Sequence, residues 1–247
     1  MSEQLFSRHG GYRRLDSFMI SSIIYYSTVE FCREHGMKGR QQEQMVQAAR
    51  SGRQNIAEGS ERASTSAETE IKLVDVARAS LIELQLDYED YINLSGGHPW
   101  PDDSQEAKDV WNVRLARLES EKYDAHNFSK LVAENRKRFA KWLKSDDPMT
   151  IANALVRLCE RADLLLHRQL DSLGERFVEE GGFREKMTRV RLSARDEHQS
   201  ESAEKQEEAP KCPACGKPMR KREAKADGKP FWGCSGYPEC RGTREYR

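Results

Sequence analysis

Apolar side chains recur every three to four residues over four long stretches of this chain, which is the pattern of amphipathic helices. The stretches are residues 12–34, 41–59, 66–94 and 148–179. The third shows the pattern most clearly, with Ile71, Val74, Leu81, Leu84, Tyr88 and Tyr91 on one stripe. Because such stripes have to be buried against each other, the sequence predicts a mainly α protein with an up-and-down four-helix bundle.

Helix signals lie at the ends of these stretches. Thr65 or Ser66 can cap the start of the third, and Asp147-Pro148 combines a capping side chain with a proline at the first helical position of the fourth. Residues 95–147 lie between the third and fourth stretches and predict a helical insertion. Its own helical patterns run over residues 110–118 and 128–143, and we expect its tryptophans to pack on the bundle. These are Trp100, Trp111 and Trp142.

Composition supports helices and a soluble setting. Charged residues make up 33% of the chain and hydrophobic residues 37%, which suits amphipathic helices better than a parallel sheet. No apolar run approaches the roughly 20 residues that span a bilayer, so no membrane association is expected. The chain opens Met-Ser-Glu-Gln-Leu, without the apolar region of a secretory signal, and this predicts a reducing, cytoplasmic location.

The charge is zero overall but unevenly distributed. Residues 196–210 contain six acidic residues and one lysine, with no large apolar side chain, which predicts an acidic disordered linker. This linker would separate a bundle domain at residues 1–195 from a small C-terminal domain at residues 211–247.

The C-terminal segment carries two pairs of cysteines in short turns, Cys212/Cys215 and Cys234/Cys240. Two such knuckles, separated by 18 residues, supply the four thiolates of a tetrahedral zinc site. The alternative is a pair of structural disulfides. Because so short a segment buries little apolar surface, the metal would supply its folding free energy, on the order of 10 kcal/mol or more. The predicted cofactor is therefore structural Zn²⁺.

Basic and aromatic residues alternate around these cysteines. Residues 211–247 contain ten lysines and arginines against four acidic residues. Cations can contact phosphates and flat rings can stack on bases, so this composition predicts a nucleic-acid contact surface. The predicted contact residues are Arg220, Lys221, Arg222, Phe231, Trp232, Tyr237, Arg241 and Arg244. For Phe231 and Trp232 the alternative is a small core beside the zinc.

The run from Phe231 to Thr243 closely resembles the C-terminal C4 zinc ribbons of bacterial type IA DNA topoisomerases, and the resemblance extends over residues 211–244. It implies a short β-structure that binds DNA, largely single-stranded, and that carries no catalysis.

A second resemblance concerns the helical part. Asn55-Ile56-Ala57-Glu58-Gly59, within residues 47–59, resembles the four-helix-bundle proteins first noticed in intervening sequences of bacterial ribosomal RNA genes. Residues 151–191 look like the extended suffix variant of that bundle. The family includes accessory proteins of diversity-generating retroelements, so the resemblance implies a homo-oligomer, nucleic-acid binding and a reverse-transcriptase partner.

No pattern of an enzyme stands out. The chain has no phosphate-binding glycine loop, no nucleophile elbow and no histidines at ligand spacing. We therefore expect a non-enzymatic accessory protein that contacts single-stranded DNA, or RNA, through the zinc ribbon, carried by an oligomerising bundle. The alternative is a protein-interaction scaffold that recruits a polymerase, a reverse transcriptase or another DNA-processing partner.

Overall fold

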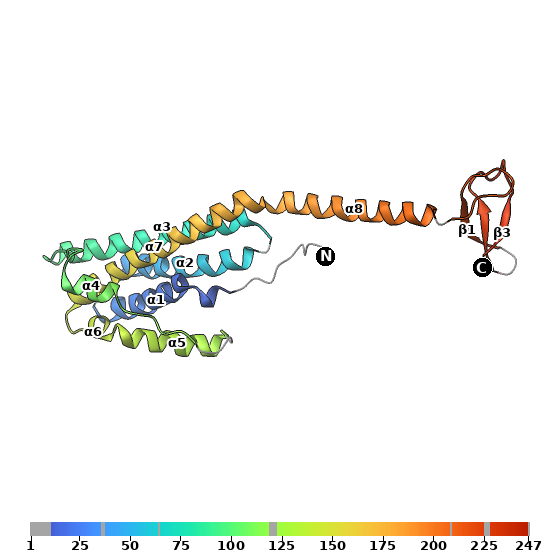
Figure 1. Cartoon of the computed structure of the whole chain (residues 1–247). Coiled ribbons are helices and arrows are strands. Elements are labelled where there is room, and N and C mark those ends of the chain that lie inside the picture. The colour runs from blue at the N-terminus through green and yellow to red at the C-terminus, as the bar shows by residue number, and fades with distance from the viewer. Residues whose placement is uncertain are drawn as a thin grey trace. The chain divides into compact units, whose positions relative to one another are not determined.

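The computed structural model describes residues 11–35, 38–63, 65–118, 123–207, 209–224 and 228–246, with the backbone alone over 198–207 (Figure 1). The chain divides into two compact units between Arg184 and Glu185. The first unit is the helical body, and the second contains a further helix and a small sheet. In the described part of the chain, no helix is both long enough and apolar enough to cross a membrane.

The body is built on the long helices that the apolar stripes predict. Following the short 3-10 turn η1 (Tyr12–Arg14), they are α1 (Asp16–Glu34), α2 (Gly39–Arg62), α3 (Ala67–Leu94) and α7 (Pro148–Glu180). Helix α1 packs on α2 and α7, and α3 packs on the same two helices, so the contacts close a ring. Neighbouring helices run in opposite directions (Figure 1). The predicted mainly helical class is confirmed, and these helices form the expected up-and-down arrangement.

The predicted caps hold the starts of two of these helices. The Ser66 hydroxyl accepts a hydrogen bond from the Thr69 N–H at 3.1 Å, and the Asp147 carboxylate accepts from Met149 and Thr150 at 3.0 Å each. Each cap satisfies donors that have no partner inside the first helical turn. Local sequence therefore fixes where α3 and α7 begin.

One continuous apolar core lies between the four long helices. Its largest fully buried side chains include Phe31 and Tyr88, whose rings meet edge to face at 5.3 Å. The Tyr88 hydroxyl donates to Thr28 Oγ1 at 2.9 Å, so this buried polar group is satisfied. Burial is the main cause that holds the pKa of Tyr88 well above its ordinary value, so the phenol stays neutral.

Helices α2 and α3 approach closely around the segment that contains Asn55. A Cβ on Gly52 would lie 2.6 Å from Leu81 Cγ, so only glycine fits there without a shift. Beside it, the Asn55 amide donates to Ser51 Oγ at 3.1 Å, and Ser51 Oγ lies 2.9 Å from Ser80 Oγ. The Ser51–Ser80 contact joins the two helices, and Asn55 supports it from within α2; the role of Asn55 in fixing helix register stays a prediction.

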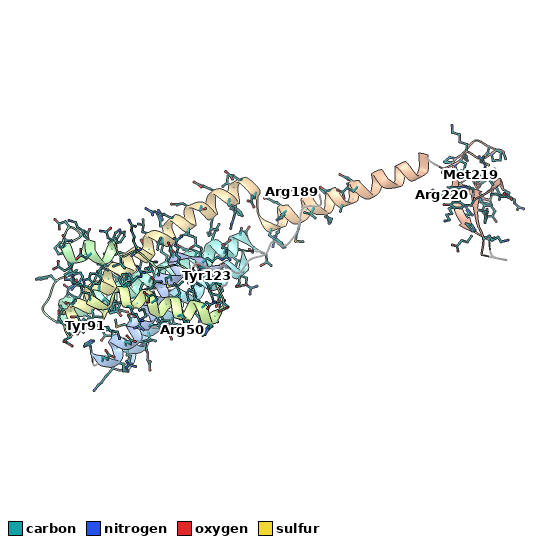
Figure 2. All side chains as sticks on the ribbon, turned by 60° about the horizontal axis from the view of Figure 1, so that its bottom comes forward. Arg50, Tyr91, Tyr123, Arg189, Met219 and Arg220 are labelled. Atoms are coloured by element: carbon teal, nitrogen blue, oxygen red, sulfur yellow. The ribbon has the colours of Figure 1, made fainter. Side chains whose placement is uncertain are left out.

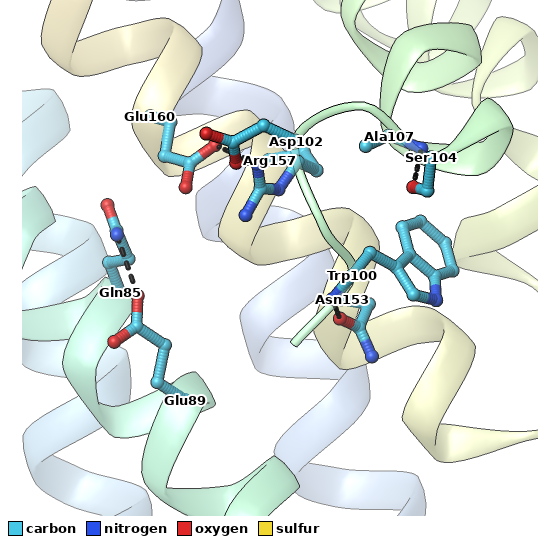
Figure 3. Close-up of polar contacts among 9 residues, drawn as sticks. All are labelled: Gln85, Glu89, Trp100, Asp102, Ser104, Ala107, Asn153, Arg157 and Glu160. Carbon is cyan, nitrogen blue, oxygen red and sulfur yellow. Dashed lines mark hydrogen bonds and ion pairs between the residues drawn. The ribbon is translucent and has the colours of Figure 1, made fainter. Parts of the chain in front are cut away.

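The insertion contains α4 (Gln105–Trp111), α5 (Ala125–Arg138) and α6 (Ala140–Leu143), and polar contacts to α7 attach its start to the bundle. The Asn153 side chain accepts a hydrogen bond from the Trp100 N–H at 2.7 Å (Figure 3). One turn further along α7, the buried Arg157 pairs with Asp102 at 2.5 Å and with Glu160 at 3.0 Å (Figure 3). The buried apolar side chains of the insertion belong to the same core as those of the four long helices, so the described part of the insertion has no separate core.

Two expectations about the insertion are wrong. The helical pattern over residues 110–118 ends at Trp111, and residues 113–118 have no regular secondary structure. The cause is the fully buried Asn135, whose amide bonds both the N–H of Ala116 (2.7 Å) and its carbonyl (3.1 Å) and so replaces helical hydrogen bonds. In addition, Trp111 stays 37% exposed, whereas Trp142 is buried and Trp100 packs on the core.

The second unit begins within α8 (Phe183–Glu207), which extends through most of the predicted disordered linker. The backbone of residues 196–207 is helical here, which differs from the expected irregular chain, and the predicted role of this segment as a linker stays a prediction. Residues 183–207 contain neither glycine nor proline and are rich in Glu, Lys, Arg, Ala and Gln, all good helix formers. Low hydrophobicity excluded a packed core for this segment, but it did not exclude an exposed helix.

The sheet consists of β1 (Met219–Glu223), β2 (Pro230–Cys234) and β3 (Thr243–Glu245), in the order β1-β2-β3 with both pairs antiparallel. Met219 and Arg220 are neighbours on β1 and point to opposite sides (Figure 2). Met219 is buried against the cysteines, and Arg220 is exposed. This alternation places Met219 and Lys221 on the metal-binding side of β1, and Arg220 and Arg222 on the opposite side.

Candidate metal centre and nucleic-acid interface

The four cysteines predicted as ligands converge in the second unit. The Sγ atoms of Cys212, Cys215, Cys234 and Cys240 all lie within 4.8 Å of one another. The shortest separations are 3.4 Å between Cys215 and Cys234 and 3.7 Å between Cys212 and Cys240. All four are free thiols, and these distances are well beyond an S–S bond of about 2.05 Å, so the disulfide alternative is excluded.

Backbone hydrogen bonds shape the two knuckles. In the first, the Gly216 N–H donates to the Cys212 carbonyl at 2.9 Å, and Gly216 has a φ of +73°, a conformation that glycine adopts readily. In the second, the Gly236 N–H donates to Cys234 Sγ at 3.3 Å, and the Cys240 N–H donates to the Gly236 carbonyl at 2.9 Å. Each knuckle thus turns its two sulfurs toward the same point.

The first knuckle also favours the thiolate form. The backbone N–H of Ala214 is the main cause that lowers the pKa of Cys212 to about 7, and the N–H of Cys215 acts in the same direction. Hydrogen bonds from the neighbouring thiols of Cys240 and Cys234 add to this effect. A thiolate is the form that binds a metal ion. Despite hydrogen bonds from Gly236 and Gly242, burial and the neighbouring thiols raise the pKa of Cys234 and Cys240, so the fold alone does not ionise all four ligands.

The geometry fits zinc. Zn–S bonds of about 2.3 Å in a tetrahedron place the sulfurs about 3.8 Å from one another, close to the separations seen here. A Cβ on Gly242 would lie 2.3 Å from Cys212 Sγ, so the chain can pass this close to the centre only with glycine at that position. Four thiolates and no free coordination position are typical of a structural zinc site. The predicted cofactor, structural Zn²⁺, is confirmed by this arrangement.

The remaining cysteines are unsuited to metal binding or redox chemistry. Cys32 and Cys159 are buried in the core of the body. Burial raises the pKa of Cys32 to about 11 and raises that of Cys159 further, so both thiols stay protonated. They are core residues of the helical body.

Around the metal centre, one face of the sheet combines cations with two rings. In the strand register, Lys221 lies opposite Trp232, which in turn lies opposite Arg244, so the three form one row across the sheet. Tyr246 adds a second ring, with its centroid 5.2 Å from that of Trp232 and Lys221 Nζ 4.3 Å above it. We call Lys221, Trp232, Arg244 and Tyr246 the stacking face.

Trp232 belongs both to this face and to the metal centre. It is partly buried and packs on the small core made by Cys212, Met219 and Cys234. The core alternative for Trp232 is therefore partly right, because one part of the ring supports the zinc site while the rest stays accessible. Phe231 is also partly buried, but it does not pack on that small core.

The other predicted contact residues lie on the second side of the sheet. Arg220 and Arg222 share that side with Phe231, since Arg222 and Phe231 are partners in the register. Arg222 extends across Gly233 and reaches Tyr237, with its guanidinium carbon 5.4 Å from the ring centroid. Arg241 is exposed in the turn between Cys240 and β3. The eight predicted contact residues therefore divide between two faces and the turn.

Tyr246 was not among the residues predicted to contact nucleic acid, although the sequence contained a signal for it. Arg244 and Tyr246 are two residues apart near a short strand, and that spacing places side chains on the same face. Only the register of β3 on β2 shows that this face also carries Trp232.

Comparison with known proteins supports this assignment for the ribbon. A family model described as topoisomerase DNA binding C4 zinc finger matches residues 209–246. No curated protein and no solved structure matches the chain. The topoisomerase-type zinc ribbon is thus confirmed, and a ribbon of this type indicates nucleic-acid binding. The resemblance of the body to the ribosomal-RNA intervening-sequence family stays a prediction.

Proposed function

We propose that this protein is a non-enzymatic accessory protein that binds single-stranded DNA through the stacking face of its zinc ribbon. The observation that carries the proposal is the row Lys221, Trp232 and Arg244 with Tyr246 beside it. Two rings at the same face offer a platform for unpaired bases, and the flanking cations meet the phosphates. A base pair inside a duplex does not present its ring surface in this way.

The energetic terms predict how binding should behave. Each stacked base contributes about 1–3 kcal/mol and tolerates any base, because every base has a flat π surface. Phosphate contacts release condensed counterions, so affinity should fall steeply with salt. The protein should therefore show strong salt dependence and little sequence preference. The description of the matching family model names DNA, which favours DNA over RNA as the ligand.

Oligomerisation of the body would strengthen this binding. Helix α3 exposes Val76, Ile82 and Leu86, and Leu86 also lines an open groove with a volume of about 730 Å³, together with residues of α2 and α3 such as Ser51 and Asp87. Exposed apolar side chains next to a groove are typical of protein-interaction surfaces. A second copy bound there would bring two ribbons onto one strand and raise the avidity by effective concentration.

The same α3 surface supports the second candidate function, a scaffold that recruits a polymerase, a reverse transcriptase or another DNA-processing protein. In that case the ribbon would contact protein. The two candidates differ in the ligand of the stacking face, so a nucleic-acid titration separates them.

The decisive test compares Tyr246→Ala with Tyr237→Ala in the full-length, zinc-loaded protein. Both tyrosines are exposed, and neither belongs to the small core at the zinc. Fluorescence anisotropy with single-stranded DNA, RNA and duplex should show that Tyr246→Ala weakens single-strand binding by roughly tenfold, the effect of one lost stacking contact. Tyr237→Ala should have a smaller effect. If neither change alters binding, or if duplex binds as tightly as single strands, the proposal is wrong.

A further inference from the structure

The body is nearly neutral overall, but it contains two helical regions of opposite charge. Residues 125–144, which form α5 and α6, contain six lysines and arginines and one acidic residue, a net charge of +5. Helix α3 contains seven acidic residues and two cations, a net charge of −5. Helix α5 packs on α1, whereas α3 packs on α2 and α7, so the two regions lie on opposite sides of the body (Figure 1). The overall neutrality therefore does not describe either surface.

The outward side of α5 and α6 is almost entirely basic. Phe128, Leu131 and Trp142 are buried against the body, which turns the opposite side of these helices to solvent. That side carries one acidic residue, Glu134, among four exposed lysines: Lys130, Lys137, Lys141 and Lys144. Lys130 and Lys137 lie seven residues apart on α5, about 10 Å at 1.5 Å per helical residue, and Lys141 and Lys144 follow on α6 and at its C-terminal cap. We call these four lysines the basic strip.

Several cations near the strip form ion pairs with acidic residues, whereas most lysines of the strip do not. Arg136 pairs with Glu30, Arg117 with Asp16 at 2.7 Å, and Lys141 of the strip with Asp109 at 3.6 Å. Within the described residues, Lys130, Lys137 and Lys144 form no ion pair. Glu34 interacts electrostatically with Lys144, and Glu134 lies between Lys130 and Lys137, but four lysines still leave an excess of positive charge. This excess favours a polyanionic partner.

Neighbouring residues extend the strip in two directions. The segment 113–118, fastened by Asn135, runs beside α5, and Arg138 donates to the Arg114 carbonyl at 3.2 Å, which leaves the exposed Arg114 at the edge of the strip. On the α1 side, Tyr26 is 42% exposed and lies between Arg136 and Arg53, with guanidinium carbons 5.9 Å and 5.6 Å from its ring centroid. Cations around an exposed ring repeat the chemistry of the stacking face.

The chemistry of this surface also distinguishes between classes of partner. Protein–protein interfaces have an apolar centre and are depleted in lysine. The large apolar side chains that the body exposes include Val76, Ile82 and Leu86 on α3, but within the described residues of α5, α6 and the segment 113–118 none is exposed to that degree. A surface rich in lysine and poor in apolar groups suits a phosphate backbone.

We infer that the basic strip is a second nucleic-acid contact, which binds the phosphate backbone. This inference rests on the proposed function, since it takes the ribbon's ligand to be nucleic acid. The strip contributes no base recognition, because lysines on a smooth helix surface reach phosphates only. Its effect is to lengthen the binding site and to increase the salt dependence.

The test uses the full-length, zinc-loaded protein with three substitutions, Lys130→Gln, Lys137→Gln and Lys144→Gln. The matched control is Arg50→Gln, Lys72→Gln and Arg168→Gln, which removes the same charge from exposed positions on α2, α3 and α7. Binding to a 30-nucleotide single strand is followed by anisotropy over a range of salt concentrations. The strip variant should bind at least tenfold more weakly at low salt, and its plot of log affinity against log salt should lose about 2 from its slope, at about 0.7 per phosphate contact. The control should change neither quantity appreciably.

Other results would overturn the inference. Equal losses in the two triple variants would show a general charge effect, and an unchanged affinity would show that the strip does not touch the ligand. Light scattering after size exclusion is run in parallel, and a change of oligomeric state in the strip variant at unchanged affinity would assign the strip to a second copy of the chain. Tyr246→Ala, measured beside these variants, separates the two hypotheses: if it has no effect while the strip variant loses affinity, the ribbon proposal fails and the strip alone binds.

Discussion

The body and the zinc ribbon reach a defined structure by different physical means. The body buries a continuous set of apolar side chains, and Ile56, Leu84, Tyr88 and Leu155 are among those fully removed from solvent. In the described part of the ribbon, Met219 is the only buried large side chain that is not a cysteine. Burying it contributes about 1.5–3 kcal/mol, whereas ordering each backbone residue costs about 1–2 kcal/mol. The ribbon therefore needs the metal, and the body does not.

This difference has a consequence for function. A module with few buried side chains has most of its side chains at the surface. In the ribbon, even Trp232 belongs to both the metal centre and the stacking face. The body instead turns most of its apolar residues inward, so its surface carries mainly charged side chains, such as those of the basic strip. The ribbon can thus offer rings for stacking, and the body offers mainly electrostatic contacts.

Removing one zinc ligand should separate the two regions most clearly. Cys215→Ser leaves three thiolates, and the ribbon loses much of a metal-binding free energy of about 10–16 kcal/mol. Zinc content should fall and single-strand binding should drop by at least tenfold, while the helical circular dichroism signal at 222 nm stays nearly unchanged. Ser235→Ala, beside the ligand Cys234, is the matched control and should retain zinc. Loss of helical signal in Cys215→Ser would show that the two regions do not fold independently.

A large-to-small change in the core should give the opposite result. Leu84 is fully buried on α3, so Leu84→Ala should lower the free energy of unfolding of the body by about 2–5 kcal/mol, from lost apolar contact and the cavity that remains. Urea unfolding followed at 222 nm measures this loss, and Leu86→Ala, at an exposed position of the same helix, is the control. Zinc affinity should be unaffected under conditions where the body stays folded. A parallel fall in zinc affinity would contradict independent folding.

The smallest effect is expected where polar groups fix helix register. Asn55→Ala removes the hydrogen bond to Ser51 and should lower the stability of the body by about 1 kcal/mol. The same urea titration measures it, and Gln54→Ala, at the neighbouring position on α2, is the control. If Asn55→Ala instead abolished nucleic-acid binding with stability unchanged, Asn55 would belong to a ligand site and its structural role would be wrong.

The sequence by itself determined the features that depend on local chemistry. Helical periodicity, the caps at Ser66 and Asp147 and the cysteine spacing each act over a few residues, so α3, α7 and the zinc ligands followed directly from them. Composition was a weaker guide. It predicted a disordered linker where α8 continues, because low hydrophobicity excludes burial but leaves the intrinsic preference for helix in place.

Only the tertiary structure decided which distant residues share a surface. The buried Asn135 bonds to Ala116, nineteen residues earlier in the chain, and so keeps residues 113–118 from forming a helix. A contact between residues this far apart cannot be predicted from a local sequence pattern. The strand register places Trp232 between Lys221 and Arg244 and brings Tyr246 beside it. Packing of α5 on α1 and of α6 on α7 turns the lysines of these helices outward, on the side opposite to the acidic α3. Surfaces of this kind depend on side-chain packing between segments far apart in the chain, and a summed charge or a one-dimensional pattern cannot represent them.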